Sequence, residues 1–511
     1  MKKFLKIIFI TLGVLFLLVL LAVAALLIAA HDKTDRTIPA VREADLDTEA
    51  LIHREAVKAL DGAAERDDID LLLDEYTMNE LLYAVAAQVD IPFVETRGAY
   101  AAYGEDGELT VELPLRAAGI LPTCIKGTLK AAYEDSTLTL TIASASIGKF
   151  SCTSGIVRAL FLNEGNGKRI EKSMAEAGVR GSLDLPTLTL TMTSEEIAET
   201  VTALTADDPN TLLYSLLCDL CLNSPDLLEF SLGENRLWGV TLHASRLAYD
   251  PATDGPQAYP LDLNTAAAQT LALGDAVTRK NVSAVFHYYT AGYKTLNETE
   301  KAAVDALGLG ENGMGVRTVS GLTMAEVLLD QSHSLAASIL ARAVTLSVTE
   351  GQMNTIFAGL DLIGTGTAFC YEGKVAYLAL ESLNVALDDR ALSVSVVFNL
   401  GGKRLCGHVA TACPDTGRMA LDATVEQLRL GSKEMSAERT ALFLRYLDGV
   451  LASQNWISAN AETSVLTLDL GAALEEISEF AVLLRLGANV TMQCRRNMGT
   501  GEIQLVFRIL S

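Results

Sequence analysis

The sequence contains an internal repeat, and this repeat limits the possible folds more than any other feature. Residues 69–83 (IDLLLDEYTMNELLY) align without a gap with residues 344–358 (VTLSVTEGQMNTIFA). In both stretches apolar residues first alternate, as in a strand with one buried face, and then recur at helical spacing. Each copy therefore predicts a strand followed at once by an amphipathic helix.

Capping motifs mark the predicted helix starts. In a capping box, the side chains of two residues three positions apart satisfy backbone N–H groups of the first helical turn. The first copy offers Thr77 with Glu80, and the second offers Thr349 with Gln352. Because the second box falls about one turn earlier in the alignment, the two predicted helices need not start at aligned positions.

The agreement between the copies continues beyond the first helix. Two further pairs of segments match: 121–149 with 403–432, and the tetrapeptide Ala-Leu-Phe-Leu at 159–162 with the same tetrapeptide at 441–444. A weaker strand-to-helix module closes each copy, at 188–201 and 465–480, and the first has a capping box at Thr193 and Glu196. Agreement at both ends of such a span indicates a duplicated unit.

These patterns predict an α+β fold with two tandem β-rich units of curved antiparallel sheet, capped amphipathic helices, and one N-terminal transmembrane helix. Residues 251–341 have no counterpart in the other copy, and 297–308 predict a helix capped by Asn297 and Glu300. The predicted domains are a cytoplasmic N-terminus (1–6), a transmembrane helix (7–30), a juxtamembrane stalk with a short helix near 48–60 (31–66), a first β-rich unit (67–250), a largely helical connector (251–341) and a second β-rich unit (342–511).

The N-terminal apolar stretch predicts a membrane anchor. Residues 7–30 carry no charge and, at about 1.5 Å per residue, are long enough to cross a hydrocarbon core of roughly 30 Å. Lys2, Lys3 and Lys6 precede this stretch, and positive flanks stay cytoplasmic. We therefore expect a single-pass cell-membrane protein whose C-terminal bulk is extracytoplasmic. Cleavage as a secretory signal is the alternative, but the best small-x-small site, at 22–24, lies inside the apolar run.

The net charge argues against nucleic acid as a partner. The chain has 40 Lys and Arg against 64 Asp and Glu, which gives a formal net charge of −24. Such a surface repels nucleic acid and anionic headgroups. The mean hydropathy is nevertheless positive, at +0.28, which is typical of extensive sheets with well-filled faces.

The eight cysteines do not form a pattern that predicts a disulfide framework. Cys124 aligns with Cys406, but Cys152 aligns with Met435, so a bond between Cys124 and Cys152 would not recur in the second copy. Cys218 and Cys221 form a CxxC pair inside an apolar run and lack a second pair at metal spacing. We expect buried, inert thiols there, while a bond between Cys124 and Cys152 stays open.

No set of residues in the sequence forms a recognisable catalytic, metal or cofactor site. Residues 308–313 (GLGENG) match the spacing GxGxxG, but a predicted helix precedes them where a dinucleotide site needs a strand, so we interpret them as a loop. The six histidines are scattered without metal spacing: His31, His53, His243, His287, His333 and His408. We therefore expect no enzyme, no cofactor and no bound metal.

Several of these motifs together resemble those of the YpmS family of membrane-anchored proteins of Gram-positive bacteria, whose function is not established. The helix opening appears as MNELL (78–82) and MNTIF (353–357). The family's "SIGxL" element appears as SIGKF (146–150) and, in degraded form, as RLG (429–431), and residues 486–510 are similar to the family's final strand pair. The resemblance implies a basic start, one membrane span and strand-rich units outside the membrane.

Asn79 and Asn354 match the asparagine of the family's helix opening. An amide in the first helical turn can bond nearby backbone, and we expect this local role for both residues rather than contact with a ligand.

Two functions outside catalysis fit these features. The first is a cell-envelope protein that binds a lipid or another hydrophobic ligand in a groove between sheet and helices. The alternative is an envelope scaffold that docks a protein partner through sheet edges or the connector. Hydrolytic activity is disfavoured because a nucleophile, a metal and a base are missing. Alternating apolar residues of two strands would line the groove: Leu109, Val111, Leu113, Leu115, Leu392, Val394, Val396 and Phe398.

Overall fold

The fold is mixed α+β with two large antiparallel sheets, as predicted. The computed structural model describes residues 48–88, 94–96, 100–104, 108–117, 121–151, 168, 171–172, 174–176, 178–184, 186–204, 222–224, 226–232, 237–311, 315–317, 326, 343–359, 363–388, 390–413, 420–451, 457–469, 489–496 and 503–510. The predicted transmembrane helix and the tetrapeptide at 159–162 lie outside these residues. Among the described residues, no helix combines the length and the apolar character that a membrane span needs.

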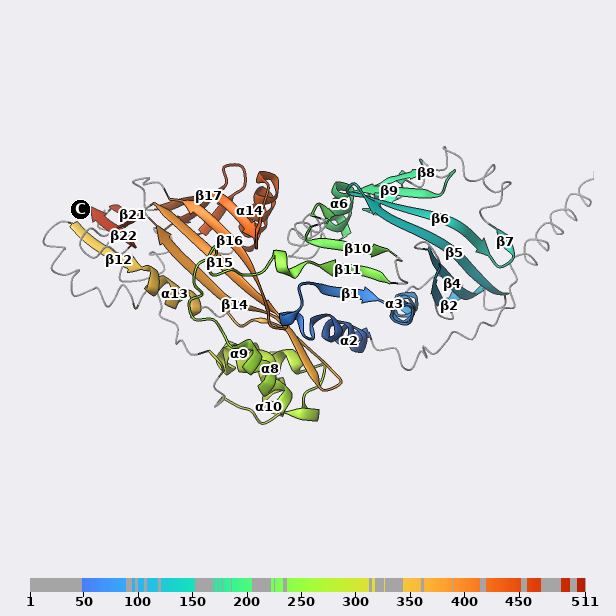
Figure 1. Ribbon diagram of the computed structural model, residues 1–511, viewed down its shortest axis with the longest axis horizontal. Helices are drawn as coiled ribbons and strands as arrows, with labels where there is room; N and C mark the ends of the chain where they lie inside the picture. The colour runs from blue at the N-terminus through green and yellow to red at the C-terminus, as the bar shows by residue number, and fades with distance from the viewer. Residues whose placement is uncertain are drawn as a thin grey trace, which may run out of the picture. The chain divides into compact units, whose positions relative to one another are not determined.

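The first large sheet comes from the first copy of the repeat (Figure 1). Its strands are β2 (Val94–Thr96), β3 (Tyr100–Tyr103), β4 (Glu108–Ala117), β5 (Leu121–Glu134), β6 (Thr137–Ile147), β7 (Phe150–Ser151), β8 (Ser182–Asp184) and β9 (Thr189–Thr193). They are arranged in the order β2-β4-β5-β6-β9-β8, with β3 also paired to β4 and β7 to β6.

The second large sheet has the same order of strands over its shared part. Its strands are β13 (Gly366–Tyr371), β14 (Lys374–Asp388), β15 (Ala391–Leu400), β16 (Lys403–Ala412), β17 (Ala420–Leu430), β18 (Lys433–Glu434), β19 (Ile457–Asn460) and β20 (Val465–Asp469). Their order is β13-β14-β15-β16-β17-β20-β19, with β18 on β17. The run β15-β16-β17-β20-β19 therefore repeats β4-β5-β6-β9-β8.

The register of the two sheets also agrees. Ile125 lies opposite Ile147 in the first sheet, and Gly407 lies opposite Leu430 in the second, at the aligned positions. A register shift follows between residues 128 and 129 and between residues 410 and 411. An extra residue in a strand bends the ladder locally, so the two sheets are bent at the same place.

Each copy also contributes a three-stranded sheet in which its first strand pairs with its last. The first has the order β1-β11-β10, from β1 (Ile69–Leu73), β10 (Leu228–Leu232) and β11 (Trp238–Leu242). The second has the order β12-β22-β21, from β12 (Ala343–Thr349), β21 (Asn489–Arg496) and β22 (Ile503–Leu510). The strand order of the small sheets is thus repeated as well.

The helices that follow β1 and β12 start at equivalent positions. They are α3 (Glu75–Gln88) and α13 (Glu350–Ala358). The predicted box at Thr349 and Gln352 is confirmed, as is the box at Thr193 and Glu196 before α6 (Ser194–Leu204).

The predicted box at Thr77 and Glu80 is wrong. The carboxylate of Asp74 instead accepts from the backbone N–H of Thr77 at 2.8 Å, so α3 starts one turn earlier. The physical reason is that an aspartate stands directly after the strand, and aspartate is a strong N-cap residue. Asp74 therefore takes the place of Thr349.

The described chain divides into two compact units whose limits differ from the predicted domains. Of the described residues, those within 48–51, 72–204 and 230–241 form compact unit 1, and those within 52–71, 205–229 and 242–511 form compact unit 2. The stalk helix predicted near 48–60 is present as α2 (Thr48–Leu60), but from residue 52 it belongs to compact unit 2. Val57 and Leu60 pack there with Ala376 of β14 and Leu400 of β15.

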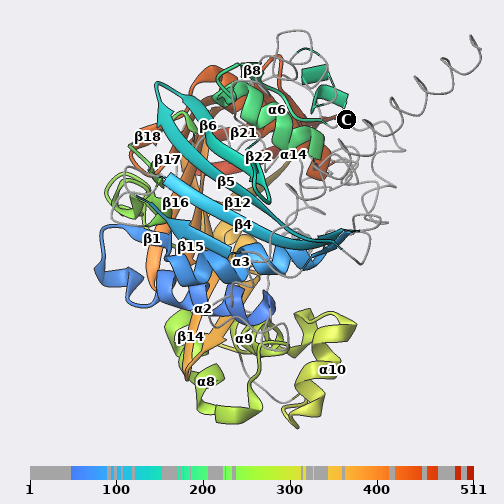
Figure 2. The ribbon, with the colours of Figure 1, turned by 90° about the vertical axis from the view of Figure 1, so that its right-hand side faces the viewer.

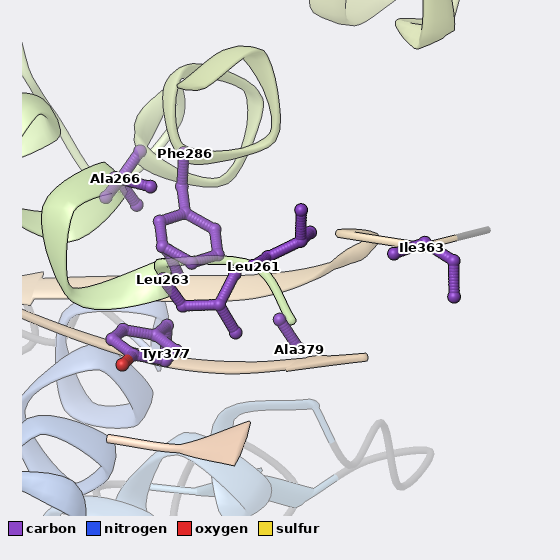
Figure 3. Close-up of a cluster of buried hydrophobic side chains, with 9 residues drawn as sticks. Leu261, Leu263, Ala266, Phe286, Ile363, Tyr377 and Ala379 are labelled. Carbon is purple, nitrogen blue, oxygen red and sulfur yellow. The ribbon is translucent and has the colours of Figure 1, made fainter. Parts of the chain in front are cut away.

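The connector is also part of compact unit 2. Its helices within the described residues are α8 (Leu263–Ala272), α9 (Val282–Ala291) and α10 (Glu298–Ala306), and the box at Asn297 and Glu300 is confirmed. Helices α8 and α9 lie against the β13–β14 hairpin (Figures 1 and 2). Phe286 points from α9 toward Leu261 and Tyr377 (Figure 3), and its ring stacks on that of Tyr377 with centroids 5.0 Å apart. Burying one such side chain contributes about 1.5–3 kcal/mol.

Candidate functional site

One face of the first large sheet is apolar and only partly covered. Leu109, Val111, Leu113 and Leu115 alternate along β4 and therefore share this face. Leu109 is buried in a cluster with Tyr103, and Met78 and Leu82 of α3 pack against it. Leu115 is also buried, while Val111 and Leu113 are partly exposed.

Three exposed apolar side chains continue this face across the neighbouring strands. Leu113 lies opposite Ile125 of β5, which lies opposite Ile147 of β6, which lies opposite Phe150 of β7. Residues directly opposite each other share a face. Ile125, Ile147 and Phe150 are 39%, 41% and 37% exposed, and we call these three residues the apolar row.

A buried hydroxyl lies beside the apolar row. Thr123 is opposite Leu115 and two residues before Ile125, so its side chain is on the apolar face. Thr123 is buried, and its Oγ1 has no hydrogen-bond partner in the part of the chain that the structure describes. A buried hydroxyl without a partner costs free energy, and a ligand oxygen at this place would supply one.

The other face of the same sheet is polar. Lys130 pairs with Glu108 at 2.8 Å, and the hydroxyls of Thr110 and Thr128 lie 3.3 Å apart. The two faces therefore differ sharply, and the exposure of the apolar row is not typical of a sheet with one solvated face.

The second large sheet places the other four predicted residues on the equivalent face. Leu392, Val394, Val396 and Phe398 alternate along β15, and all four are at least partly exposed. Phe398 is 43% exposed and lies opposite Leu380 of β14. The eight residues predicted to line a groove therefore lie on equivalent strand faces, four in each compact unit.

Helices cover this second face at two places. Leu405, opposite Phe398, packs in the cluster of α2, whereas Val409, opposite Val394, packs in the clusters of α14 (Ala437–Leu451). Between them Val396 faces Gly407, which contributes no side chain. The partly exposed apolar strip from Val396 to Phe398 therefore lies between two helix-covered clusters.

A buried polar cluster on the opposite face of this sheet was not predicted. The carboxylate of Asp254, 1% exposed, accepts from Arg429 at 2.9 Å. Ser395 Oγ donates to the backbone carbonyl of Asp254 at 2.9 Å and lies 2.9 Å from Nδ1 of His408. Cys406 is next to this cluster on β16, and its thiol is free.

The cluster holds no activated nucleophile. Since Ser395 donates its proton to the carbonyl of Asp254, His408 must donate through Nδ1 and cannot act as a base toward that hydroxyl. Burial lowers the pKa of His408, which favours the neutral ring. Burial also raises the pKa of Cys406 to about 12, so this thiol stays protonated at neutral pH. The geometry points to a structural role.

A single segment carries Asp254 across this face, and we call residues 246–258 the strap. Leu247 accepts from the backbone of Cys406, and Gln257 donates to Ser382 at 2.9 Å. Gln257 also lies 3.3 Å from Glu381, whose fully buried carboxylate is paired with Arg404 at 2.8 Å. No residue pattern in the sequence indicated which surface the strap would cross.

Within the part of the chain that the structure describes, the remaining titratable side chains do not gather into a metal site. No group of three or more histidine, cysteine, aspartate or glutamate side chains among the described residues is arranged to hold a metal ion. His243 lies 2.9 Å from Asp68 and 3.6 Å from Glu229, and His287 lies 3.1 Å from Glu300.

Other predicted features fall partly outside the described residues. The predicted GxGxxG loop follows α10, with positive φ at Gly308 and Gly310, while Gly313 lies outside. Cys152, Cys218 and Cys221 lie outside as well, so their predicted states stay predictions.

Comparisons of this chain with protein-family models, with curated proteins and with solved structures found no match.

Proposed function

We propose that this chain is a non-enzymatic, membrane-anchored protein of the cell envelope that binds a lipid or another hydrophobic ligand. The observation that carries the proposal is the apolar row of Ile125, Ile147 and Phe150, which exposes aliphatic and aromatic surface on one face of a regular sheet. Contiguous exposed apolar surface often marks a binding site, whereas apolar residues scattered singly over a solvated face do not.

The architecture that we propose with this function is a tandem duplication of one YpmS-like unit behind a transmembrane helix at residues 7–30. The matching strand orders and the matching register of the two large sheets support the duplication. The uncharged apolar stretch supports the anchor.

An acyl chain suits the apolar row for energetic reasons. Each CH₂ group removed from water contributes about 0.8 kcal/mol, so contact with a few side chains is enough for measurable binding. The hydroxyl of Thr123, which has no partner among the described residues, lies on the same face and would donate a hydrogen bond to a carboxylate or ester oxygen. The ligand expected here is therefore a long-chain molecule with a polar end.

The test uses the full chain purified from its host membrane, labelled with a photoactivatable long-chain fatty acid. Ile147→Asp places a charge in the apolar row, whereas Ser146→Asp, the matched control, places the same charge on the polar face of the same strand. We expect labelling to fall about tenfold in the first variant only, which corresponds to roughly 1.4 kcal/mol.

Equal labelling of the two variants, together with no lipid extracted from the purified chain, would sink the proposal. A specific protein cross-link in the absence of lipid would favour the alternative, an envelope scaffold. Mapping the labelled peptides by mass spectrometry separates binding at the apolar row from binding at the strip from Val396 to Phe398.

A further inference from the structure

Two side chains of α13 bind the edge of strand β14. The amide of Asn354 donates to the backbone carbonyl of Val385 at 2.8 Å and accepts from the backbone N–H of the same residue at 2.7 Å. The carboxylate of Glu350 accepts from the backbone N–H of Leu387 at 2.9 Å. Three consecutive outward-facing backbone groups of the strand are therefore satisfied by side chains and not by another strand.

These contacts lie where the neighbouring strand has ended. Strand β13 pairs with residues 374–379 of β14, and the last backbone bonds on this side join residues 364 and 365 to Leu380. Beyond that point β14 pairs with β15 on its other side, while α13 occupies the open side. Helix α13 thus covers the part of the β14 edge that β13 leaves unpaired.

Helical geometry explains why this pair of residues fits. Side chains four positions apart on a helix are separated by about 6 Å along its axis. Backbone groups on one edge of a strand recur every two residues, which is about 6.6 Å. Glu350 and Asn354 therefore match the spacing of Leu387 and Val385.

The first copy of the repeat has the same arrangement at the aligned residues. The amide of Asn79 donates to the carbonyl of Ala101 at 2.8 Å and accepts from its N–H, while the carboxylate of Glu75 accepts from the N–H of Tyr103 at 3.1 Å. The bound strand is β3, which pairs with β4. Both copies thus use a Glu-x-x-x-Asn pair at a sheet edge.

We propose that the Glu350–Asn354 pair is an edge closure that prevents β14 from pairing with β14 of another molecule of this chain. An open strand edge is a template for such pairing. The side-chain amide of Asn354 satisfies the N–H and C=O groups at the strand edge. It also ends the hydrogen-bond ladder, because a side chain offers no further backbone groups to which another strand could bond.

Another molecule of the same chain is the expected partner because the edge is self-complementary. Two antiparallel copies related by a twofold axis would present the same N–H and C=O groups to each other. The segment Leu383–Leu387 (LNVAL) carries no charge, so no charged side chain within this segment opposes such pairing once Glu350 is removed.

The experiment compares the full-chain variant Glu350→Ala/Asn354→Leu with wild type by light scattering over a range of concentrations, with helix content followed by circular dichroism. We expect the apparent mass of the variant to rise with concentration above that of wild type. The matched control is Gln352→Ala, which removes the capping box of the same helix but leaves both edge contacts in place. Its mass should follow wild type.

A folded double variant whose mass equals that of wild type at every concentration overturns the proposal, because the pair then serves only to fix the helix. If the double variant does not fold, the single variant Glu350→Ala decides, since it opens the N–H of Leu387 alone. A smaller rise in mass supports the edge closure, and an unchanged mass overturns it.

Discussion

Asn79 and Asn354, far apart in the chain, hold the edge of a strand in the same way: each amide pairs with the N–H and the C=O of one strand residue, Ala101 or Val385. Both asparagines are buried. The expected role was local, within the first helical turn, and the amide of Asn79 does donate to the carbonyl of Glu75. The cross-element contact is nevertheless the one that both copies share.

Replacing Asn354 with alanine should open the edge of β14. A buried backbone group left without a partner costs about 1–3 kcal/mol, and Asn354→Ala leaves two. Hydrogen exchange of the peptide around Val385 should therefore accelerate strongly. The control is Gly351→Ala on the same helix, where an added Cβ meets nothing within 4 Å and should not raise exchange. Unchanged protection in Asn354→Ala would show that another group satisfies Val385.

Replacing Gly401 with alanine should detach α2 from the second large sheet. A Cβ at Gly401, which has φ +55°, would lie 2.4 Å from the backbone oxygen of Leu60. Gly373 has φ +71° with nothing within 4 Å, so Gly373→Ala reports the backbone strain alone, about 1–2 kcal/mol. We expect Gly401→Ala to lower the thermal midpoint clearly more than Gly373→Ala, and equal shifts would contradict the packing of α2.

The ion pair of Asp254 and Arg429 should fasten the strap. Because Asp254 is almost fully buried, removing either partner leaves a charge without compensation. A double-mutant cycle with Asp254→Ala and Arg429→Met should give a coupling energy of about 1.5–3 kcal/mol in urea unfolding. A coupling below roughly 0.5 kcal/mol, the value of an exposed pair, would count against this role.

Cys406 should make the fold sensitive to alkaline pH. Burial raises the pKa of its thiol from 9.0 to about 12, so between these values the unfolded chain loses the proton first. The stability that depends on the protonated thiol is complete below pH 9 and falls as the pH rises toward 12. Comparing urea midpoints of wild type and Cys406→Ala across this window isolates the effect, because other groups titrate in both. A parallel decline in the two proteins would refute it.

The repeat predicted the alternating faces of the strands in both copies because periodicity alone sets which side of a strand is buried, whereas the order of the strands within each sheet was not predicted. Leu109 and Leu392, for example, fall at equivalent register positions without any knowledge of their neighbours. The helix start at Asp74 was missed because two residue pairs can each provide a cap, and the sequence does not state where the strand ends.

The position of α2, the connector and the strap could not be predicted from the sequence. The pattern of Leu51, His53 and Val57 indicates that one face of α2 is buried, but it does not name the surface that covers it. In the same way, the sequence shows Asp254 only as an acidic residue among turn residues. Its ion pair with Arg429 depends on the path that the folded chain takes. Contacts of this kind depend on the tertiary arrangement, which local patterns do not encode.

Because α2 belongs to compact unit 2, it is synthesised long before the strands that cover it, and this affects the order in which parts of the protein fold. The backbone N–H of Cys370 donates to the ring of His53 across 317 positions, so α2 emerges long before its covering strands are made. Closing such a distant contact is entropically costly and slow. During synthesis the apolar side of α2 stays uncovered until β13 to β16 have been made, so one of the earliest described helices to appear is among the last to be buried.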